Sequence, residues 1–288
     1  MKSIDYYSYP KEELIALNKA EPTNSEILLA LGNKYENDNN FVKAFTYYKK
    51  ASKLGNLEAT HYLGNYYFTG KGTKLDFKKA RSCYLKNSKV NHLSSILKLA
   101  LIYLEGKGVE INEKKSLSFI KKAVKLNSTS ALFSLGQYHL KGIGTKQNPK
   151  LAFRYFKKAA DLYYPDAEIQ TGDMYFKGIG VKQNYKKALQ YYKRASDDCS
   201  CSYPKVQAGI MYKEGLGTKI NYKKAKKYFL EAIDFDEDGQ AYFMLGNLYE
   251  EGLGVEKDLK KAKECYFSAM MQSYVNGRHK YVELDRKD

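Results

Sequence analysis

The sequence has no tryptophan, only four cysteines and four histidines, and no long apolar stretch. Nowhere does it approach the ~18 uncharged apolar residues that a helix needs to cross a membrane. The first residues, MKSIDYYSYPKEELIALNKA, include an early charge but neither the apolar core nor the small-residue cleavage site of a secretory leader. We therefore expect a soluble, cytoplasmic protein without a transmembrane segment.

The cysteines form no metal-binding pattern. Cys83 and Cys265 are isolated, and the neighbours Cys199 and Cys201 have no histidine or further cysteine beside them. A structural zinc site needs a cluster of such ligands at characteristic spacings. We expect reduced thiols, no metal ion and no other cofactor.

The charge is strongly basic. Lys and Arg number 49 against 32 Asp and Glu, which gives a net charge of +17, and tyrosine is abundant at 28 residues. Such an excess permits binding to anionic partners. It is also what codon bias in an AT-rich genome produces, because Lys, Asn, Tyr and Ile are all frequent. Composition alone leaves both interpretations open.

A glycine pair, G-x-G, recurs along the chain at intervals of 36 or 37 residues. The second glycines are Gly72, Gly108, Gly144, Gly180, Gly217 and Gly254. A phosphate-binding loop would need a strand before it and a helix N-terminus aimed at the ligand. Six near-identical loops instead indicate a structural repeat.

Each loop joins two expected helices, which we call helix A before the loop and helix B after it. In helix A a small residue is followed three places later by an aromatic residue, as in Gly172 and Tyr175. In helix B small and apolar residues recur at offsets of three, four and seven, which marks one buried helix face. An Asn or Asp such as Asn184 stands where the N-cap of helix B is needed.

The consensus of these units reads L-G-x-x-Y-x-x-G-x-G-V-x-x-D-x-x-K-A-x-x-Y-Y-x-x-A-A, and the stretch from Leu245 to Ala269 matches it most closely. It resembles the Sel-1-like repeat, a relative of the tetratricopeptide repeat. The resemblance implies an all-α fold, a right-handed α-α superhelical solenoid of about seven helix-pair repeats. We expect an N-terminal capping helix in residues 1–29, a tetratricopeptide-like repeat at 30–60, six Sel-1-like repeats at 61–272 and a C-terminal cap at 273–288, forming one continuous domain.

Signals of catalysis are weak. Ser95 and Ser118 each begin an S-x-x-K match, but the S-D-N and K-T-G partners of a serine acyl-enzyme are absent. His139 occupies the recurring tyrosine position of helix A, which favours a packed core imidazole over a ligand or base. Most tyrosines likewise recur at interior positions, so we expect them to pack between helices. We predict that the protein is not an enzyme.

The charge is sorted by helix. The helix B segments carry a formal charge of +26 in total, whereas the helix A segments carry −4. In tetratricopeptide-like solenoids helix A lines the concave surface and helix B the convex back. The resemblance therefore implies a near-neutral groove and a basic ridge, and the ridge is either a solvated face or an anion-binding surface.

The groove is where the resemblance places a partner peptide. We expect the positions three before, one after and four after the helix A glycine to point into it. The candidate residues are Asn33, Asn65, Phe68, Phe133, Gln137, Ile169, Asp173, Phe176, Phe243, Asn247 and Glu250. Asn33 and Asn65 resemble the asparagine of the tetratricopeptide carboxylate clamp, but Glu26 and Leu29 stand where its lysines would be.

These observations predict a monomeric, non-catalytic scaffold or adaptor that binds a protein or peptide partner through the helix A groove. The alternative is a binder of nucleic acid or another anionic surface through the helix B ridge.

Overall fold

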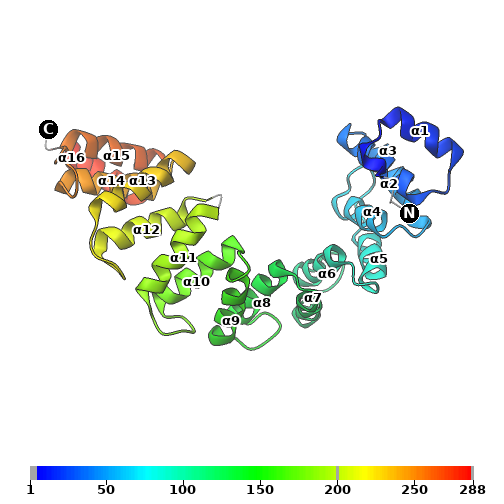
Figure 1. Ribbon diagram of the computed structural model, residues 1–288, viewed down its shortest axis with the longest axis horizontal. Helices are drawn as coiled ribbons and strands as arrows, with labels where there is room; N and C mark the ends of the chain where they lie inside the picture. The colour runs from blue at the N-terminus through cyan, green and yellow to red at the C-terminus, as the bar shows by residue number, and fades with distance from the viewer. Residues whose placement is uncertain (1–4, 199–200, 287–288) are drawn as a thin grey trace. The chain divides into compact units, whose positions relative to one another are not determined.

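The computed structural model describes residues 5–198 and 201–286, and within these ranges it consists of helices and their connections (Figure 1). The all-α fold of helix pairs is therefore confirmed. The helices belong to two compact units, Met1–Gln147 and Asn148–Asp288.

The first unit begins with a short 3-10 turn, η1, and continues with helices in which consecutive members pack together. They are η1 (Tyr6–Ser8), α1 (Lys11–Ala20), α2 (Ser25–Asn37), α3 (Phe41–Lys53), α4 (Leu57–Thr69), α5 (Phe77–Ser88), α6 (Leu93–Glu105), α7 (Glu113–Lys125) and α8 (Thr129–Lys141).

The second unit repeats the same alternation of helix A and helix B. Its helices are α9 (Pro149–Ala160), α10 (Pro165–Lys177), α11 (Tyr185–Asp198), α12 (Tyr203–Glu214), α13 (Tyr222–Asp236), α14 (Gly239–Glu251), α15 (Leu259–Met271) and α16 (Val275–Asp285). The even-numbered helices from α2 to α14 are the expected helices A, and the odd-numbered helices from α3 to α15 are the expected helices B.

Helix α1 lies where the sequence predicts a helix at the N-terminus. Its Leu14 is fully buried in a cluster with Ile27, Ala30 and Leu31 of α2. The following pair, α2 and α3, is joined by a short turn in which Asn39 has a φ of 57°, without a G-x-G loop. The proposed boundaries between capping, tetratricopeptide-like and Sel-1-like segments stay predictions.

The G-x-G loops are built to turn the chain. Gly178 has a φ of 72° and its N–H donates to the carbonyl of Met174, which ends α10. Gly180 has a φ of 69°, and a Cβ there would lie 2.2 Å from the carbonyl oxygen of Pro149 at the start of α9. The loop is closed when the N–H of Asn184 donates to the carbonyl of Tyr175 at 2.8 Å. Both glycines are thus required by backbone conformation and close packing.

The expected N-caps of helix B are present. Asn184 accepts a hydrogen bond from the backbone N–H of Lys187 at 2.9 Å, and Asn148 accepts one from Leu151 at 3.0 Å. These bonds satisfy donors that have no partner within the helix. The same arrangement in the other G-x-G repeats confirms the predicted helix starts.

Helix A and helix B meet where a glycine lies under a ring. A Cβ on Gly209 of α12 would lie 2.5 Å from the ring of Phe229 of α13, which is fully buried. The pairs Gly32 and Tyr48, Gly64 and Tyr84, Gly172 and Tyr192, and Gly246 and Tyr266 make the same contact. The third repeat has Ala100 in place of the glycine and Ile120 in place of the ring. The extra methyl group of the alanine thus occurs together with a smaller helix B side chain that has no ring.

Two of the cysteine expectations hold and one is wrong. Cys83 and Cys265 are free, as expected, and burial raises the pKa of each thiol to about 11. Cys201 is instead disulfide-bonded. Cys199 lies outside the described residues.

Candidate partner-binding surfaces

The predicted groove residues all lie on helices A and all are half-buried. In the first unit Asn33 lies on α2, Asn65 and Phe68 on α4, and Phe133 and Gln137 on α8. In the second unit α10 carries Ile169, Asp173 and Phe176, and α14 carries Phe243, Asn247 and Glu250. Each unit therefore presents its own part of the proposed surface.

The polar residue after the helix A glycine accepts a hydrogen bond from a buried tyrosine. Tyr84 Oη donates to Asn65 Oδ1 at 2.7 Å, and Tyr192 Oη donates to Asp173 Oδ1 at 2.6 Å. Tyr48 with Asn33 and Tyr266 with Asn247 form the same bond at 2.7 Å. These side chains thus accept from the hydroxyl of a buried ring, and Glu36 and Glu250 are second acceptors for Tyr48 at 2.7 Å and for Tyr266 at 2.6 Å.

A sequence signal for this role is present within the chain. The residue after the glycine is Asn or Asp in the repeats whose helix B ring is a tyrosine, and it is Leu101, Gln137 or Ile210 where helix B has Ile120, Phe156 or Phe229. An Asn or Asp acceptor on helix A therefore occurs in the same repeats as a tyrosine hydroxyl on helix B. Gln137 is the one polar residue of this set without a tyrosine at the matching position.

The predicted aromatic residues also have packing contacts. Phe68 meets the edge of Phe77 at 5.3 Å between ring centroids, and Phe176 meets Tyr185 in the same way at 5.3 Å. Phe243 lies 5.5 Å from the ring of the fully buried Tyr266 and 5.3 Å from that of Tyr274. These rings are partly enclosed, so substitutions there change stability as well as any partner contact.

A hollow between consecutive helices A lies in the first unit. It has a volume of about 330 Å³ and is lined by Asn33 and Glu36 of α2, Tyr62 of α4 and Tyr7 of η1. Tyr7 is 47% exposed. Burial raises the pKa of Tyr7, and Glu26 and Glu58 add to the effect. The hollow is thus lined by one predicted residue, Asn33, and by two tyrosines, Tyr7 and Tyr62, that the repeat pattern did not indicate as binding residues.

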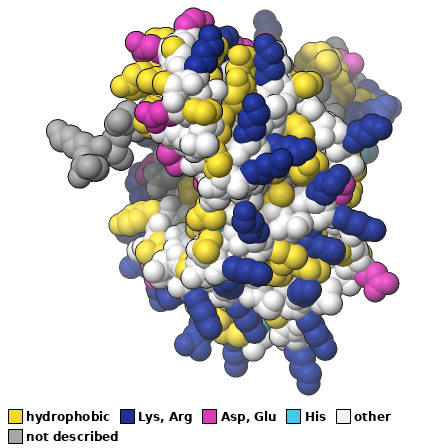
Figure 2. Space-filling view, turned by 90° about the vertical axis from the view of Figure 1, so that its right-hand side faces the viewer, with side chains coloured by type: hydrophobic (Ala, Val, Ile, Leu, Met, Phe, Trp, Pro, Cys, Tyr) yellow, Lys and Arg dark blue, Asp and Glu magenta, His cyan; other side chains and the backbone are white. Residues whose placement is uncertain are grey.

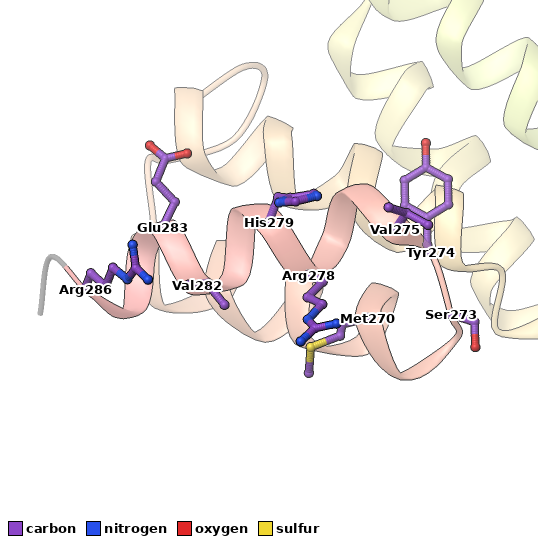
Figure 3. Close-up of a pocket in the computed structure, with 9 residues that line it drawn as sticks. All are labelled: Met270, Ser273, Tyr274, Val275, Arg278, His279, Val282, Glu283 and Arg286. Carbon is purple, nitrogen blue, oxygen red and sulfur yellow. The ribbon is translucent and has the colours of Figure 1, made fainter.

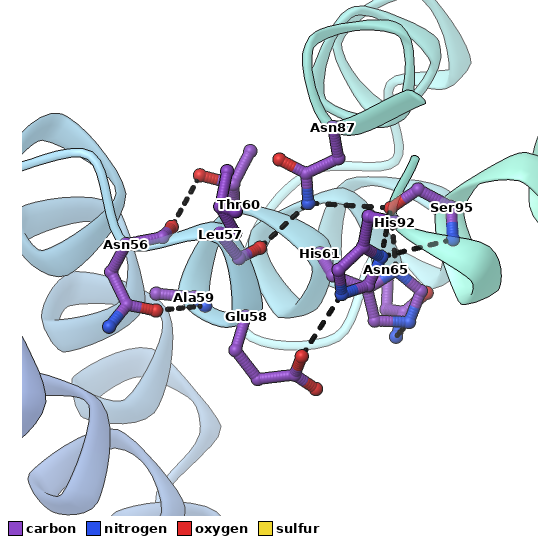
Figure 4. Close-up of polar contacts among 10 residues, drawn as sticks. All are labelled: Asn56, Leu57, Glu58, Ala59, Thr60, His61, Asn65, Asn87, His92 and Ser95. Carbon is purple, nitrogen blue, oxygen red and sulfur yellow. Dashed lines mark hydrogen bonds and ion pairs between the residues drawn. The ribbon is translucent and has the colours of Figure 1, made fainter. Parts of the chain in front are cut away.

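A polar cluster links α4, α5 and α6 (Figure 4). Ser95 Oγ lies 3.1 Å from Nδ1 of both His61 and His92, and His92 Nε2 lies 3.0 Å from Glu58 Oε2. The order serine, histidine, glutamate resembles a hydrolase triad. Ser95 is fully buried and is also close to Asn87 Nδ2 at 3.4 Å, so a substrate has no access to its hydroxyl. This burial favours a structural role for the cluster.

Two histidines of the first unit, His61 and His139, have a lowered pKa. Burial lowers the pKa of His61 to about 4, and the nearby His92 acts in the same direction. Burial also lowers the pKa of His139, which is 7% exposed, as expected for a packed imidazole. Within the described residues no group of His, Cys, Asp and Glu has the arrangement of a metal site.

The basic helices B carry a regular lysine. In six repeats the lysine before the small helix B residue lies over the helix A tyrosine, with Nζ 4.3 to 5.7 Å from the ring centroid. In the remaining repeat both partners differ, because His139 replaces the tyrosine and Leu151 the lysine. This cation–π contact gives part of the helix B charge a structural role. Figure 2 shows one face of the molecule on which Lys and Arg side chains are widely spread among apolar and uncharged ones.

A large hollow borders α16, outside the predicted groove. It has a volume of about 1170 Å³ and is lined by Met270, Arg278, His279, Val282 and other residues of the last two helices and their connection. Figure 3 shows that Arg278 and Met270 lie on a different side of α16 from His279 and Glu283, so these groups do not converge on one ligand.

No helix in the described part of the chain combines the length and apolar character needed to cross a membrane.

The comparisons with known proteins agree on the family. The model of the Sel1 repeat matches residues 32–56, 57–86, 93–128, 129–164, 165–198, 206–234 and 239–274. No curated protein matches the sequence.

Two solved structures are similar in sequence and fold. One is a protective antigen present in uropathogenic Escherichia coli strains displaying an SLR fold, with 25% identity and a TM-score of 0.88. The match covers 96% of this chain but only 59% of that one. The other is a Sel1 repeat protein from Oxalobacter formigenes, with 27% identity, a TM-score of 0.70 and coverage of 84% and 98%. Because the family model matches seven successive segments, this chain belongs to the Sel1 repeat family.

Proposed function

We propose that the protein is a non-catalytic scaffold that binds a protein partner through its helix A surface. Sel1 repeat proteins are generally protein-interaction scaffolds, which supports the class of function. The cytoplasmic location and the monomeric state of this protein stay predictions.

The observation that carries the proposed location is the hollow between α2 and α4. It combines the half-exposed Tyr7, the ring of Tyr62, and the polar side chains of Asn33 and Glu36. Aromatic side chains beside polar ones are the groups that dominate protein interfaces. Gln137 of α8 adds a polar side chain that no buried tyrosine requires.

The test compares purified baits that differ only on one surface. The groove variant is Tyr7→Ser with Gln137→Ser, because these residues lie outside the glycine and ring contacts. The control is Lys224→Gln on helix B. We expect the wild type and the control to capture the same protein. Once that protein is purified, it is expected to bind the groove variant at least about tenfold more weakly, which is the loss typical of a removed hot spot.

Stability is measured alongside, and all three baits are expected to stay folded at the temperature of the binding assay. Binding that is unchanged in the groove variant would refute the helix A location.

A second candidate function is favoured by the separation of charge. The helix B segments carry +26 and the helix A segments −4, so an anionic partner is attracted to the helix B side. Binding of nucleic acid or acidic vesicles at low salt, weakening steeply with ionic strength, is the expected sign. Absence of affinity for both at low salt would remove this candidate.

A further inference from the structure

A basic cleft lies on the helix B side of the second unit, where α9, α10 and α11 meet. Its volume of about 510 Å³ is within the range of ligand-binding pockets. Lys187, Gln190, Tyr191 and Arg194 share one face of α11, because residues three, four and seven apart lie on the same side of a helix. The lining is completed by Lys157, Tyr175, Lys193 and Asp197.

Two of the four cations are neutralised within the protein. Lys157 Nζ lies 2.7 Å from Asp161, and Arg194 lies 2.5 Å from the fully buried Glu168. Lys187 and Lys193 are exposed and, among the described residues, have no ion pair. The four cations of the cleft also outnumber the carboxylates near them, which are those of Asp161, Glu168 and Asp197. The cleft therefore keeps a positive charge that is open to a partner.

The aromatic rings of the cleft are not available for stacking. Tyr175 and Tyr191 are 5% and 9% exposed, and they stack on each other at 5.8 Å. Lys187 covers Tyr175 at 5.2 Å, and the Arg194 guanidinium lies 5.5 Å from the ring of Tyr191. Single-stranded nucleic acid is usually held by stacking its bases on free aromatic faces. These rings act as walls, which disfavours nucleic acid as the occupant.

The recess also disfavours a flat anionic surface. A bilayer would meet the exposed lysine tips but not the recessed Tyr191 and the half-buried Arg194. An extended peptide has a backbone that offers carbonyl groups to the amide of Gln190, which lines the cleft. Its acidic side chains supply the carboxylates that Lys187 and Lys193 lack.

We propose that this cleft docks an acidic segment of a protein partner, with carboxylates paired to Lys187 and Lys193. The proposal shares the basic helix B side with the second candidate function, but it assigns a different ligand, an acidic protein segment in place of nucleic acid or a bilayer.

The next repeat supplies a natural comparison. Lys224 lies 5.2 Å from the ring of Tyr212, which stacks on Tyr228 at 5.7 Å, so the scaffold is the same. However, Leu230 stands in place of Lys193 and Glu231 in place of Arg194, and Lys227, in place of Gln190, is paired with Glu231 at 3.5 Å. Lys224 thus has the same contact with a tyrosine ring but no counterpart of the exposed Lys193 beside it, so Lys224→Gln is a matched control.

The experiment measures fluorescence anisotropy of a fluorescein-labelled peptide of glutamate and serine at low salt. The variant Lys187→Gln with Lys193→Gln is expected to bind it about tenfold more weakly, the loss expected for two exposed charge pairs. Lys224→Gln and the charge-preserving Lys187→Arg with Lys193→Arg are expected to bind like the wild type. A peptide with glutamine in place of glutamate is expected not to bind.

Four results would overturn the proposal. The first is that the wild type does not bind the acidic peptide, and the second is that the glutamine double variant binds it as well as the wild type does. The third is that Lys224→Gln loses as much affinity for the peptide as the double variant. The fourth is that duplex DNA or phosphatidylserine vesicles bind more tightly than the peptide and that this binding is lost in the double variant. The DNA and vesicle measurements report on the second candidate function separately. Melting temperatures of the variants above the assay temperature show that any loss is not due to unfolding.

Discussion

Five of the described helix pairs are built around a contact between a helix A glycine and a helix B ring. The ring needs a glycine beneath it, and a tyrosine also needs an oxygen on the following residue. The third repeat replaces the glycine by Ala100 and the ring by Ile120, and Ser116 then donates to the carbonyl of Ala100 at 2.5 Å. Residues at these positions are therefore coupled in pairs.

The change Gly209→Ala tests this coupling. We expect a net loss of about 1–2 kcal/mol in the free energy of unfolding, because the new methyl group would overlap the buried ring of Phe229 by more than helix propensity returns. Urea denaturation measures the loss. In a Phe229→Ile background the same change is expected to be neutral or stabilising, and an equal loss in both backgrounds would contradict the coupling.

The buried His61 makes the stability of the first unit depend on pH. Its pKa is lowered from 6.5 to about 4, mainly by burial and also by His92 and Lys98, against the opposing effect of Glu58. The unfolded chain thus binds more protons than the fold between these values. Stability is complete above pH 6.5 and falls as the pH drops towards 4, by up to about 3 kcal/mol.

Thermal or urea unfolding between pH 4 and 7 measures this dependence. We expect His61→Gln to flatten the curve in part, since the lowered pKa of His139 contributes in the same direction. An unchanged slope in His61→Gln would show that other groups cause the pH dependence.

At the scale of elements, α9, α10 and α11 are joined by the half-buried Arg194, which forms an ion pair with one helix and a hydrogen bond with another. Arg194 of α11 reaches the fully buried Glu168 of α10 at 2.5 Å and the carbonyl of Ala160 at the end of α9 at 2.8 Å. Removal of one partner from such a pair leaves a charge in a site without water.

We expect Arg194→Met to lower the free energy of unfolding by about 3 kcal/mol. The neighbouring Lys193→Met should stay within about 0.5 kcal/mol of the wild type, because Lys193 is exposed. Chemical denaturation compares the two. If the double variant Glu168→Gln with Arg194→Met is not more stable than Arg194→Met alone, the buried charge is not the cause.

At the scale of the whole molecule, the charge of +17 opposes folding through repulsion among the helix B lysines. Salt screens this repulsion, since the Debye length falls from about 30 Å at 0.01 M to about 8 Å at 0.15 M. The lysines that lie over tyrosine rings are stabilised locally and reduce the effect.

A rise in ionic strength across this range is therefore expected to increase the melting temperature by about 2–4 °C, which corresponds to ~1 kcal/mol. Differential scanning fluorimetry at constant pH measures it. A fall in melting temperature would mean that ion pairs such as Lys157 with Asp161 outweigh the repulsion.

Part of the proposed binding surface could be predicted from the chain alone, and part could not. The helix A positions were located correctly on helices, but the tyrosine hydroxyl bound to Asn65 or Asp173 was not predicted. The paired variation of acceptor and ring within the repeats was a signal that could have shown it. Tyr7 and Tyr62 had no such signal, because the hollow that they line depends on how η1 folds back towards α2 and α4.

The sequence by itself determined the number of helix pairs, the loop positions and the caps. Those features depend on glycine conformation, helix periodicity and hydrogen bonds between residues only a few places apart, so they recur wherever the motif recurs. Only the tertiary structure decided which polar and charged groups are already satisfied. Glu168 and Arg194 are 26 residues apart in sequence, and their burial and pairing follow from the packing of three helices. For the same reason the lysines of the basic cleft could be separated into neutralised and open charges only once that packing was known.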